Sequence, residues 1–365
     1  MQQHFLLTGA GFSRNWGGWV ADEAFEYLLG SSHTDEPLRE LLWRDKNNGL
    51  GFEDSLATLQ EQYELQERDN FQPHGWRRLC RFLWRRRDRN WSPQVEQNLT
   101  NLTSGLQRMF GDMTLGFSRQ PFEFCDDPEI QVSEFLSKFN AIFTLNQDTL
   151  LEAKYFGTLK QKPFIAGGGI YSPNYADAYR PGIIRALDTL AYGSLANRIN
   201  LFKPEPEPFI LKPDLQPYFK LHGSADFQVG ARETMLILGG NKPERINKQP
   251  LLRWYHELFR RHLEIPDARL MVIGYSFGDP HINEIIINGV KCGLRLFIID
   301  LAGVDVIGRR SNISPDNVSL LKNSVIGASR RPLSMTFGGE DMIEFRKINR
   351  FFRSARMDVT YHPAF

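Results

Sequence analysis

The sequence predicts an α/β fold built on a mainly parallel sheet, and three observations lead to this expectation. A short apolar strand near the N-terminus runs into a glycine turn, a long and mostly helical stretch follows, and apolar strands then return. Because parallel strands are covered on both faces, they read as continuous apolar runs of this kind. The combination is typical of a Rossmann-like fold that carries a large helical insertion after its first strand.

Strands are expected where short apolar segments end in glycine or small polar residues. They are His4–Thr8, Ala141–Leu145, Tyr218–Leu221, Met235–Leu238, Ala268–Ile273 and Leu294–Ile299. A helix from Pro280 to Val290 connects the last two strands. The stretch from Trp19 to Phe139 is expected to be mostly helical, and Glu53–Glu67 and Gln94–Phe110 within it show helical periodicity.

We expect the whole chain, residues 1–365, to form one elaborated domain. The expected parts are a Rossmann-like core at residues 1–20 and 138–304, a helical insertion at 21–137 and a C-terminal extension at 305–365. Residues 156–217 are rich in glycine, proline and tyrosine, so a small irregular module is expected there.

The composition is that of a globular protein, with 41% hydrophobic residues, 24% charged residues and a formal net charge of +1. No apolar run approaches the ~20 residues that cross a bilayer, so we expect a cytoplasmic protein without membrane contact. The three cysteines, Cys80, Cys125 and Cys292, are widely separated and form no Cys-x-x-Cys pair. They fit a reducing compartment, and they predict neither a zinc module nor another metal site.

The segment from Arg77 to Arg89 combines apolar residues at helical spacing with seven arginines. It reads as an amphipathic helix with a basic face that is either solvated or contacts a partner. Contact with nucleic acid is the alternative, but no aromatic-basic alternation or groove-reading motif accompanies the arginines.

The glycine turn after the first strand, Gly9-Ala10-Gly11-Phe12-Ser13, is typical of a nucleotide site. Glycines let backbone N–H groups approach a pyrophosphate that side chains would exclude. A dinucleotide fingerprint would carry a third glycine where this chain has Arg14, and an acidic residue after a second strand. A tight strand-to-helix turn without a ligand is therefore the alternative.

Small or polar residues follow five of the expected strands, at the edge where open parallel sheets bind ligands. Beyond the glycine turn they are Thr144, Asn146, Asp148, His222, Gly274, Tyr275, Ser276 and Asp300. Structural alternatives exist, because Asn146, Asp148 and Asp300 are typical caps of helices or turns and His222-Gly223 alone is typical of a turn. Their coincidence at one edge of the sheet predicts a functional site.

These motifs occur in the order found in sirtuin-like NAD-dependent enzymes, which the chain resembles over its sheet-forming segments. The form Gly-Tyr-Ser-Phe-Gly-Asp-Pro-His-Ile-Asn, here Gly274 to Asn283, is similar to the bacterial branch associated with antiphage defence. The resemblance implies NAD as substrate, a homo-oligomer, and a defence partner such as a HerA-type ATPase or a prokaryotic Argonaute.

The chain departs from the deacylases of that family in two ways. It lacks their four-cysteine zinc module, and Arg14 to Trp19 replaces their Gly-Ile-Pro-Asp-Phe-Arg type segment. Deacylation of a peptide is therefore the least favoured activity.

The resemblance implies that Asn146 and His222 are catalytic, with Asn146 holding the ribose or the attacking water and His222 acting as base. It also implies NAD contacts from Gly9, Ala10, Gly11, Phe12, Ser13, Thr144, Asp148, Gly274, Tyr275, Ser276 and Asp300. The expected activity is cleavage of NAD to nicotinamide and ADP-ribose. The alternatives are an NAD or ADP-ribose sensor without turnover and a DNA nuclease subunit, although no compact acidic metal-binding motif supports a nuclease.

Overall fold

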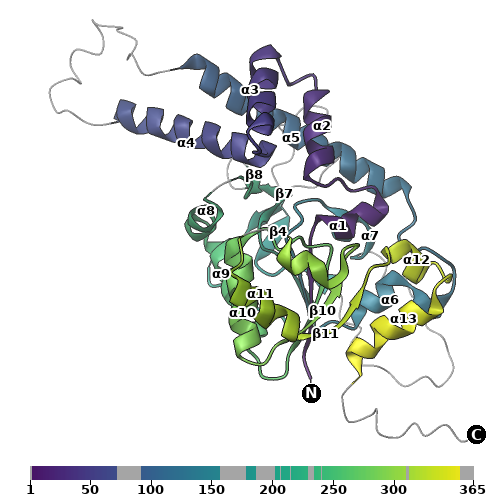
Figure 1. Cartoon of the computed structure of the whole chain (residues 1–365). Helices are drawn as coiled ribbons and strands as arrows, with labels where there is room; N and C mark the ends of the chain where they lie inside the picture. The colour runs from purple at the N-terminus through teal and green to yellow at the C-terminus, as the bar shows by residue number, and fades with distance from the viewer. Residues whose placement is uncertain are drawn as a thin grey trace, which may run out of the picture. The chain divides into compact units, whose positions relative to one another are not determined.

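A computed structural model describes residues 2–71, 92–156, 178–185, 202–205, 207–213, 215–228, 234–239, 241–309 and 312–353 (Figure 1). The expected Arg77–Arg89 helix and much of the expected irregular module lie outside these residues. The described part is a mixed α/β structure with a parallel sheet, as the sequence predicts.

The main sheet has seven strands in the order β11-β10-β9-β1-β2-β6-β3, and its neighbouring strands are parallel. The strands are β1 (His4–Thr8), β2 (Ala141–Thr144), β3 (Ala178–Tyr179), β6 (Gln216–Lys220), β9 (Arg269–Ile273), β10 (Arg295–Ile299) and β11 (Val325–Ser329). The four strands β1, β2, β9 and β10 are buried over most of their length. This burial explains why their sequences are continuous apolar runs.

Helices cover both faces of this sheet (Figure 1). One face is packed by α9 (Pro250–Leu263), where Phe259 contacts Phe143 of β2, and α10 (Pro280–Lys291) packs against α9. On the other face Phe351 packs against Phe297 of β10 and against His4. The remaining helices around the sheet are α1 (Ala10–Ser13), α6 (Val132–Ser137), α7 (Leu150–Lys154), α11 (Pro315–Asn323), α12 (Leu333–Phe337) and α13 (Met342–Asn349).

A second, smaller sheet has the order β4-β5-β7-β8. Its strands are β4 (Ile183–Arg185), β5 (Phe202–Pro204), β7 (Gly223–Gln228) and β8 (Thr234–Leu236). The expected strand at Met235–Leu238 is found here as β8, and it pairs antiparallel with β7. The sequence pattern indicated a strand correctly but did not reveal which sheet it joins.

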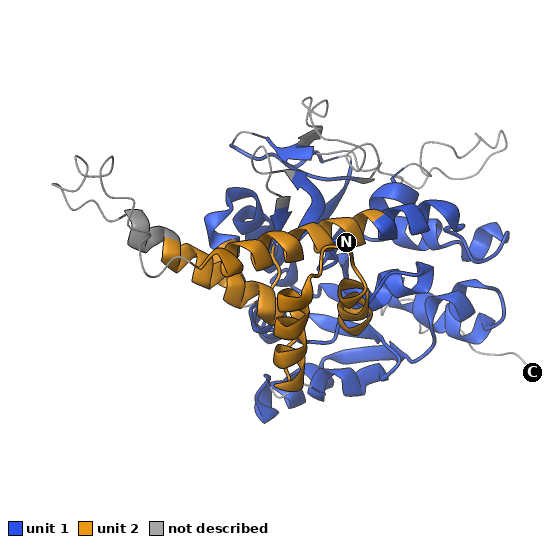
Figure 2. Ribbon diagram, turned by 90° about the horizontal axis from the view of Figure 1, so that it is seen from above, with its two compact units in different colours: residues 1–19, 112–236, 246–365 blue, residues 20–111, 237–245 orange. Residues whose placement is uncertain are grey.

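The described chain divides into two compact units (Figure 2). Unit 1 comprises residues 1–19, 112–236 and 246–365 and contains both sheets, and unit 2 comprises residues 20–111 and 237–245. The helices of unit 2 are α2 (Ala21–Leu29), α3 (Glu36–Asn47) and α4 (Phe52–Phe71), while α5 (Pro93–Arg119) and α8 (Lys242–Lys248) each contain a unit boundary. Short 3-10 helices lie at Arg14–Trp16, Pro128–Ile130, Gly303–Gly308 and Arg350–Phe352.

The helix α3 of unit 2 begins with a conventional side-chain cap. The Asp35 carboxylate accepts a hydrogen bond from the Leu38 N–H at 3.1 Å, which caps α3. Leu38 and Leu42 of that helix are buried.

The edge strand β11 was not predicted from the sequence. It lies within the expected C-terminal extension, yet it pairs in parallel with β10. Its sequence, Val-Ile-Gly-Ala-Ser, is only partly buried and contains Gly327, where an added Cβ would lie 2.4 Å from the Phe297 ring. An edge strand of this kind gives a weak apolar signal, which explains the omission.

Candidate functional site

Six strands of the main sheet end in register at one edge. Their last paired residues form a single row: Ser329, Ile299, Ile273, Thr8, Thr144 and Lys220. The predicted site residues follow this row at the carboxyl ends of the strands, with Gly9, Gly274 and Asp300 one residue beyond it and Asn146 and His222 two residues beyond it. This is the edge at which open parallel sheets bind their ligands.

Asn146 faces the glycine turn of β1. Its Nδ2 donates to the Ser13 Oγ at 2.8 Å, and both side chains are buried. The Thr144 Oγ1 accepts from the Asn146 N–H at 3.0 Å and from the Thr8 Oγ1 at 2.7 Å. The side chain of Asn146 is therefore held by its hydrogen bond to Ser13 rather than used as a helix cap.

The glycine turn is packed tightly against the loop that follows β9. The Gly9 N–H donates to the Ile273 carbonyl and the Gly11 N–H donates to the Gly274 carbonyl, each at 3.0 Å. An added Cβ on Gly9 would lie 2.5 Å from the Gly274 oxygen, and Gly274 itself has a φ of 63°. The glycines are thus required for close backbone approach, and two of the N–H groups expected to contact phosphate already have partners.

The other residues of the turn differ in exposure. Ala10 is exposed, whereas Phe12 is buried with its ring 5.1 Å from that of Trp16. Phe12 therefore contributes to the core beside the turn.

His222 follows β6 and is buried at 3% exposure. Its carbonyl accepts from the Gln147 Nε2 at 3.4 Å, which connects it to the loop that carries Asn146. The next residue, Gly223, has a φ of 74°, and an added Cβ there would lie 1.9 Å from the Met235 oxygen. Only glycine fits at this turn, which fixes the backbone beside His222.

Two further histidines that the sequence analysis did not assign lie beside His222. The Nε2 of His222 is 3.1 Å from the Nε2 of His281, at the start of α10. The His256 ring is 5.6 Å from the His281 ring, and its Nε2 bonds the Leu221 carbonyl at 2.9 Å. Burial lowers the pKa of His256 to about 4, so this side chain is neutral at pH 7. His281 lies within the Gly274–Asn283 motif, so that motif was the signal for it.

Asp148 is buried next to a network of charged side chains. Its Oδ1 accepts from the Leu150 N–H at 3.0 Å, so the helix-cap alternative describes this carboxylate. The Lys220 Nζ donates to the Asp148 carbonyl and lies 2.8 Å from Glu152 Oε1. Arg180 lies 3.3 Å from Glu152 and 2.9 Å from Asp226.

This network supports the loop that carries Asn146 and Asp148. Burial raises the pKa of Glu152, and the charges of Lys220 and Arg180 oppose that rise. Lys220 is fully buried, and a lysine within the expected apolar strand Tyr218–Leu221 was the sequence signal that could have identified it.

The residues after β9 and β10 also make local contacts. The Tyr275 hydroxyl donates to the Asn283 Oδ1 at 2.9 Å, while Ser276 is exposed. Asp300 Oδ1 accepts from the Ala302 N–H at 2.8 Å, which is the turn-cap alternative. Tyr275 and Asp300 thus have structural roles, and contact with NAD remains a prediction for both.

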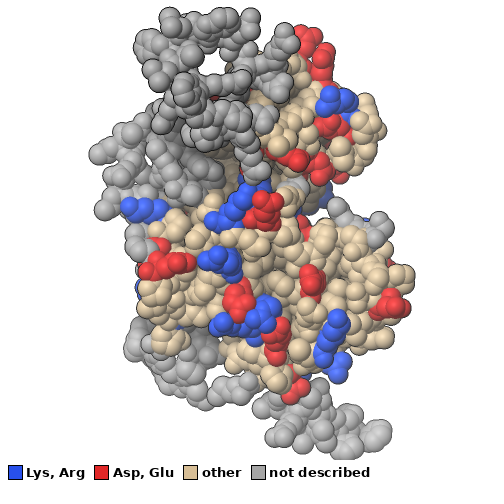
Figure 3. Space-filling model, turned by 90° about the vertical axis from the view of Figure 1, so that its left-hand side faces the viewer, with Lys and Arg blue, Asp and Glu red and all other residues tan. Residues whose placement is uncertain are grey.

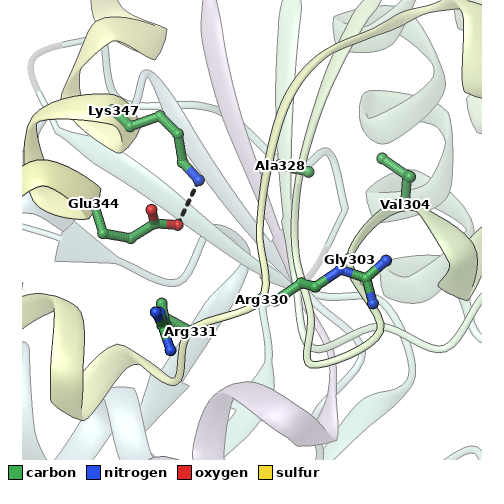
Figure 4. A pocket seen from close by; sticks show the side chains of 7 residues that line it. All are labelled: Gly303, Val304, Ala328, Arg330, Arg331, Glu344 and Lys347. Atoms are coloured by element: carbon green, nitrogen blue, oxygen red, sulfur yellow. Dashed lines mark ion pairs between the residues drawn. The ribbon is translucent and has the colours of Figure 1, made fainter.

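A cavity of about 470 Å³ lies beyond the ends of β10 and β11 (Figure 4). It is lined by Gly303, Val304, Ala328, Arg330, Arg331, Glu344 and Lys347. Lys347 pairs with Glu344 at 2.6 Å, as the dashed line shows, and Arg330 extends alongside Gly303. Arg330 and Arg331 pair with Asp305 and Asp341 at 2.6 and 3.6 Å. These carboxylates balance the positive charge of the lining.

Basic and acidic side chains are also interspersed on the face shown in Figure 3. Arg260 of α9 pairs with Glu257 and Glu264, each at 2.8 Å. Such exposed pairs neutralise one another and do not form a basic surface for phosphate groups.

Comparison with known families gives one match relevant to this site. The family model described as a SIR2-like domain matches residues 140–291, and this part of the chain is therefore similar to that domain. The matched segment includes Asn146, His222 and Gly274, whereas Gly9 and Asp300 lie outside it. No curated protein matches the chain.

None of the described helices is long and apolar enough to span a membrane. In the part of the chain that the structure describes, no group of three or more His, Cys, Asp or Glu side chains is arranged to hold a metal ion.

Proposed function

We propose that the chain is an NAD glycohydrolase, which cleaves NAD to nicotinamide and ADP-ribose. The observation that carries the proposal is the hydrogen bond between Asn146 and Ser13, which joins the end of β2 to the glycine turn of β1. His222 follows the neighbouring strand at the equivalent position. These residues are the catalytic pair that the resemblance implies, and the SIR2-like match independently supports NAD-related activity.

Cleavage of NAD depends more on the positioning of the ribose and the attacking water than on a strong acid or base. Nicotinamide is cationic in NAD, and breaking its bond to ribose develops oxocarbenium character at the anomeric carbon. Asn146 would hold the ribose or the attacking water through its amide, and His222 would accept a proton from water or a ribose hydroxyl. The Asp300 carboxylate would accept a hydrogen bond from a hydroxyl of the adenosine ribose.

We further propose that the enzyme is an effector of antiphage defence that depletes NAD within an oligomeric or partner-controlled complex. The support is the resemblance of Gly274 to Asn283 to the defence-associated branch, for which a HerA-type ATPase is the partner to test first. An enzyme that destroys NAD has to be restrained in healthy cells, which favours control by assembly.

The direct test measures nicotinamide release from NAD by the purified chain, alone and with the ATPase. His222→Ala should lower the rate by about 10²- to 10⁴-fold, the usual contribution of general-base catalysis. Asn146→Ala should lower the rate by about 10²-fold, because the ribose or the attacking water is no longer positioned. His33→Ala, in unit 2, is the matched control and should retain full activity.

Binding measured by calorimetry separates the alternatives. NAD binding without turnover, even with the partner present, would contradict the glycohydrolase and favour a sensor. Undiminished release by the Asn146 and His222 variants would remove the catalytic assignment.

A further inference from the structure

His222 and His281 share a hydrogen bond that admits one proton. Their Nε2 atoms are 3.1 Å apart, and their ring centroids are separated by 5.2 Å. In such a pair one nitrogen must carry the proton and the other must accept it. Protonation of both nitrogens would remove the hydrogen bond and place two positive charges side by side.

His256, the third histidine of this group, does not accept the shared proton at its Nε2. His256 is neutral near pH 7, and its Nε2 must donate to the Leu221 carbonyl because a carbonyl only accepts. That bond holds the residue immediately before His222. Asp279, which precedes α10, is the nearest acidic residue in the sequence to His281.

Because His222 is buried, a hydrogen-bond partner is needed to stabilise its protonated form. His222 is almost fully buried, so an imidazolium there without a partner would be costly. His281 is half-buried at the first turn of α10 and is therefore closer to solvent. The pair thus connects a buried imidazole to a more accessible one.

We propose that His281 is a positioning residue and proton partner for His222. This inference rests on the proposed NAD hydrolysis. In that reaction water forms the new bond to the anomeric carbon, and the electron pair of the broken bond neutralises nicotinamide. The proton lost by water enters His222 at Nδ1, the Nε2 proton of His222 moves to His281, and His281 releases a proton to solvent.

The kinetic test compares His281→Gln and His281→Phe with the wild-type enzyme. Glutamine keeps a hydrogen bond but cannot carry the proton, and phenylalanine keeps neither. Both should lower kcat by roughly 10- to 100-fold, part of the usual effect of general-base catalysis, with KM changed less than about 3-fold. His33→Gln is the control and should change neither constant. An unchanged kcat in both His281 variants would overturn the proposal.

Nitrogen-15 spectra of the histidine rings in the wild-type protein test the pair without any turnover. The shared proton predicts one protonated and one bare Nε2, and a change in the His222 titration in His281→Gln. The same protonation at both Nε2 atoms, or an unaltered titration, would overturn the pairing. If NAD is not cleaved but these spectra show the shared proton, the glycohydrolase fails while the pairing stands.

Discussion

At the scale of single residues, the candidate site depends on side chains that the sequence shows less clearly than its motifs. Asn146 and His222 were predicted because each follows an apolar strand. Lys220 and His281 were not predicted, although an apolar segment and the Gly274–Asn283 motif contain them, because the partners that give them a role come from distant segments. Lys220, for example, is positioned by Glu152 of α7 and by the carbonyl of Asp148.

Loss of Lys220 should destabilise the protein strongly. Lys220→Met removes one cation from a buried network and leaves Glu152 with less compensation, which typically costs about 3–5 kcal/mol. Unfolding in urea measures the effect as a lower midpoint. Arg330→Met, which breaks an exposed pair with Asp305, is the matched control and should shift the midpoint little. Equal midpoints for wild type and Lys220→Met would contradict the stabilising role of the network.

At the scale of elements, the strands that are buried on both faces of the sheet were predictable. The strands β1, β2, β9 and β10 combine continuous apolar sequence with burial in the middle of the sheet. The strand β7, Gly-Ser-Ala-Asp-Phe-Gln, has no such apolar run, because it contains Ser224 and Asp226. These two side chains are buried in the fold and form a hydrogen bond to each other. Polar strands of this kind are recognisable only once their partners are known.

The helix α9 should make stability depend on pH through His256. Its folded pKa of about 4 lies below the ordinary 6.5, so the unfolded chain binds a proton that the folded chain excludes. The contribution of neutral His256 to the free energy of unfolding is fully present above pH 6.5 and is lost as the pH falls toward 4. The free energy of unfolding changes by roughly 3 kcal/mol over this pH range.

Urea unfolding at pH 7 and pH 5 tests this dependence. His256→Gln keeps a donor for the Leu221 carbonyl but does not titrate, so its stability should fall less on acidification than that of the wild type. His4 and His262 also have lowered pKa values and remain in both proteins, which leaves a common background. The same pH dependence in both proteins would contradict the role of His256.

At the scale of the whole molecule, the fold class was predictable but the assembly of the chain was not. Apolar runs and the glycine turn indicated a parallel α/β sheet, and the structure confirms it. The expected domain boundaries, the oligomer and the role of the Arg77–Arg89 segment stay predictions. Charge pattern alone does not reveal which surface another chain covers.

The oligomer can be tested with the segment that the sequence singles out. We predict that the partner of the arginine-rich stretch is a second copy of the chain. Replacing residues 72–91 with a short Gly-Ser linker should then lower the molar mass measured by light scattering, because this interface is lost. A deletion of residues 354–365 serves as the control and should leave the mass unchanged. A wild-type monomer, or a linker variant that keeps the wild-type mass, would argue against this interface.

The central place of β1 has a consequence for biosynthesis. This strand is made before both of its neighbours, because β2 and β9 follow more than one hundred and more than two hundred residues later. Until Arg269–Ile273 leaves the ribosome, β1 cannot pair with a strand on both sides. The unpaired backbone edge of this apolar strand can then pair with a wrong strand. Nascent chains shorter than this should therefore depend on chaperones.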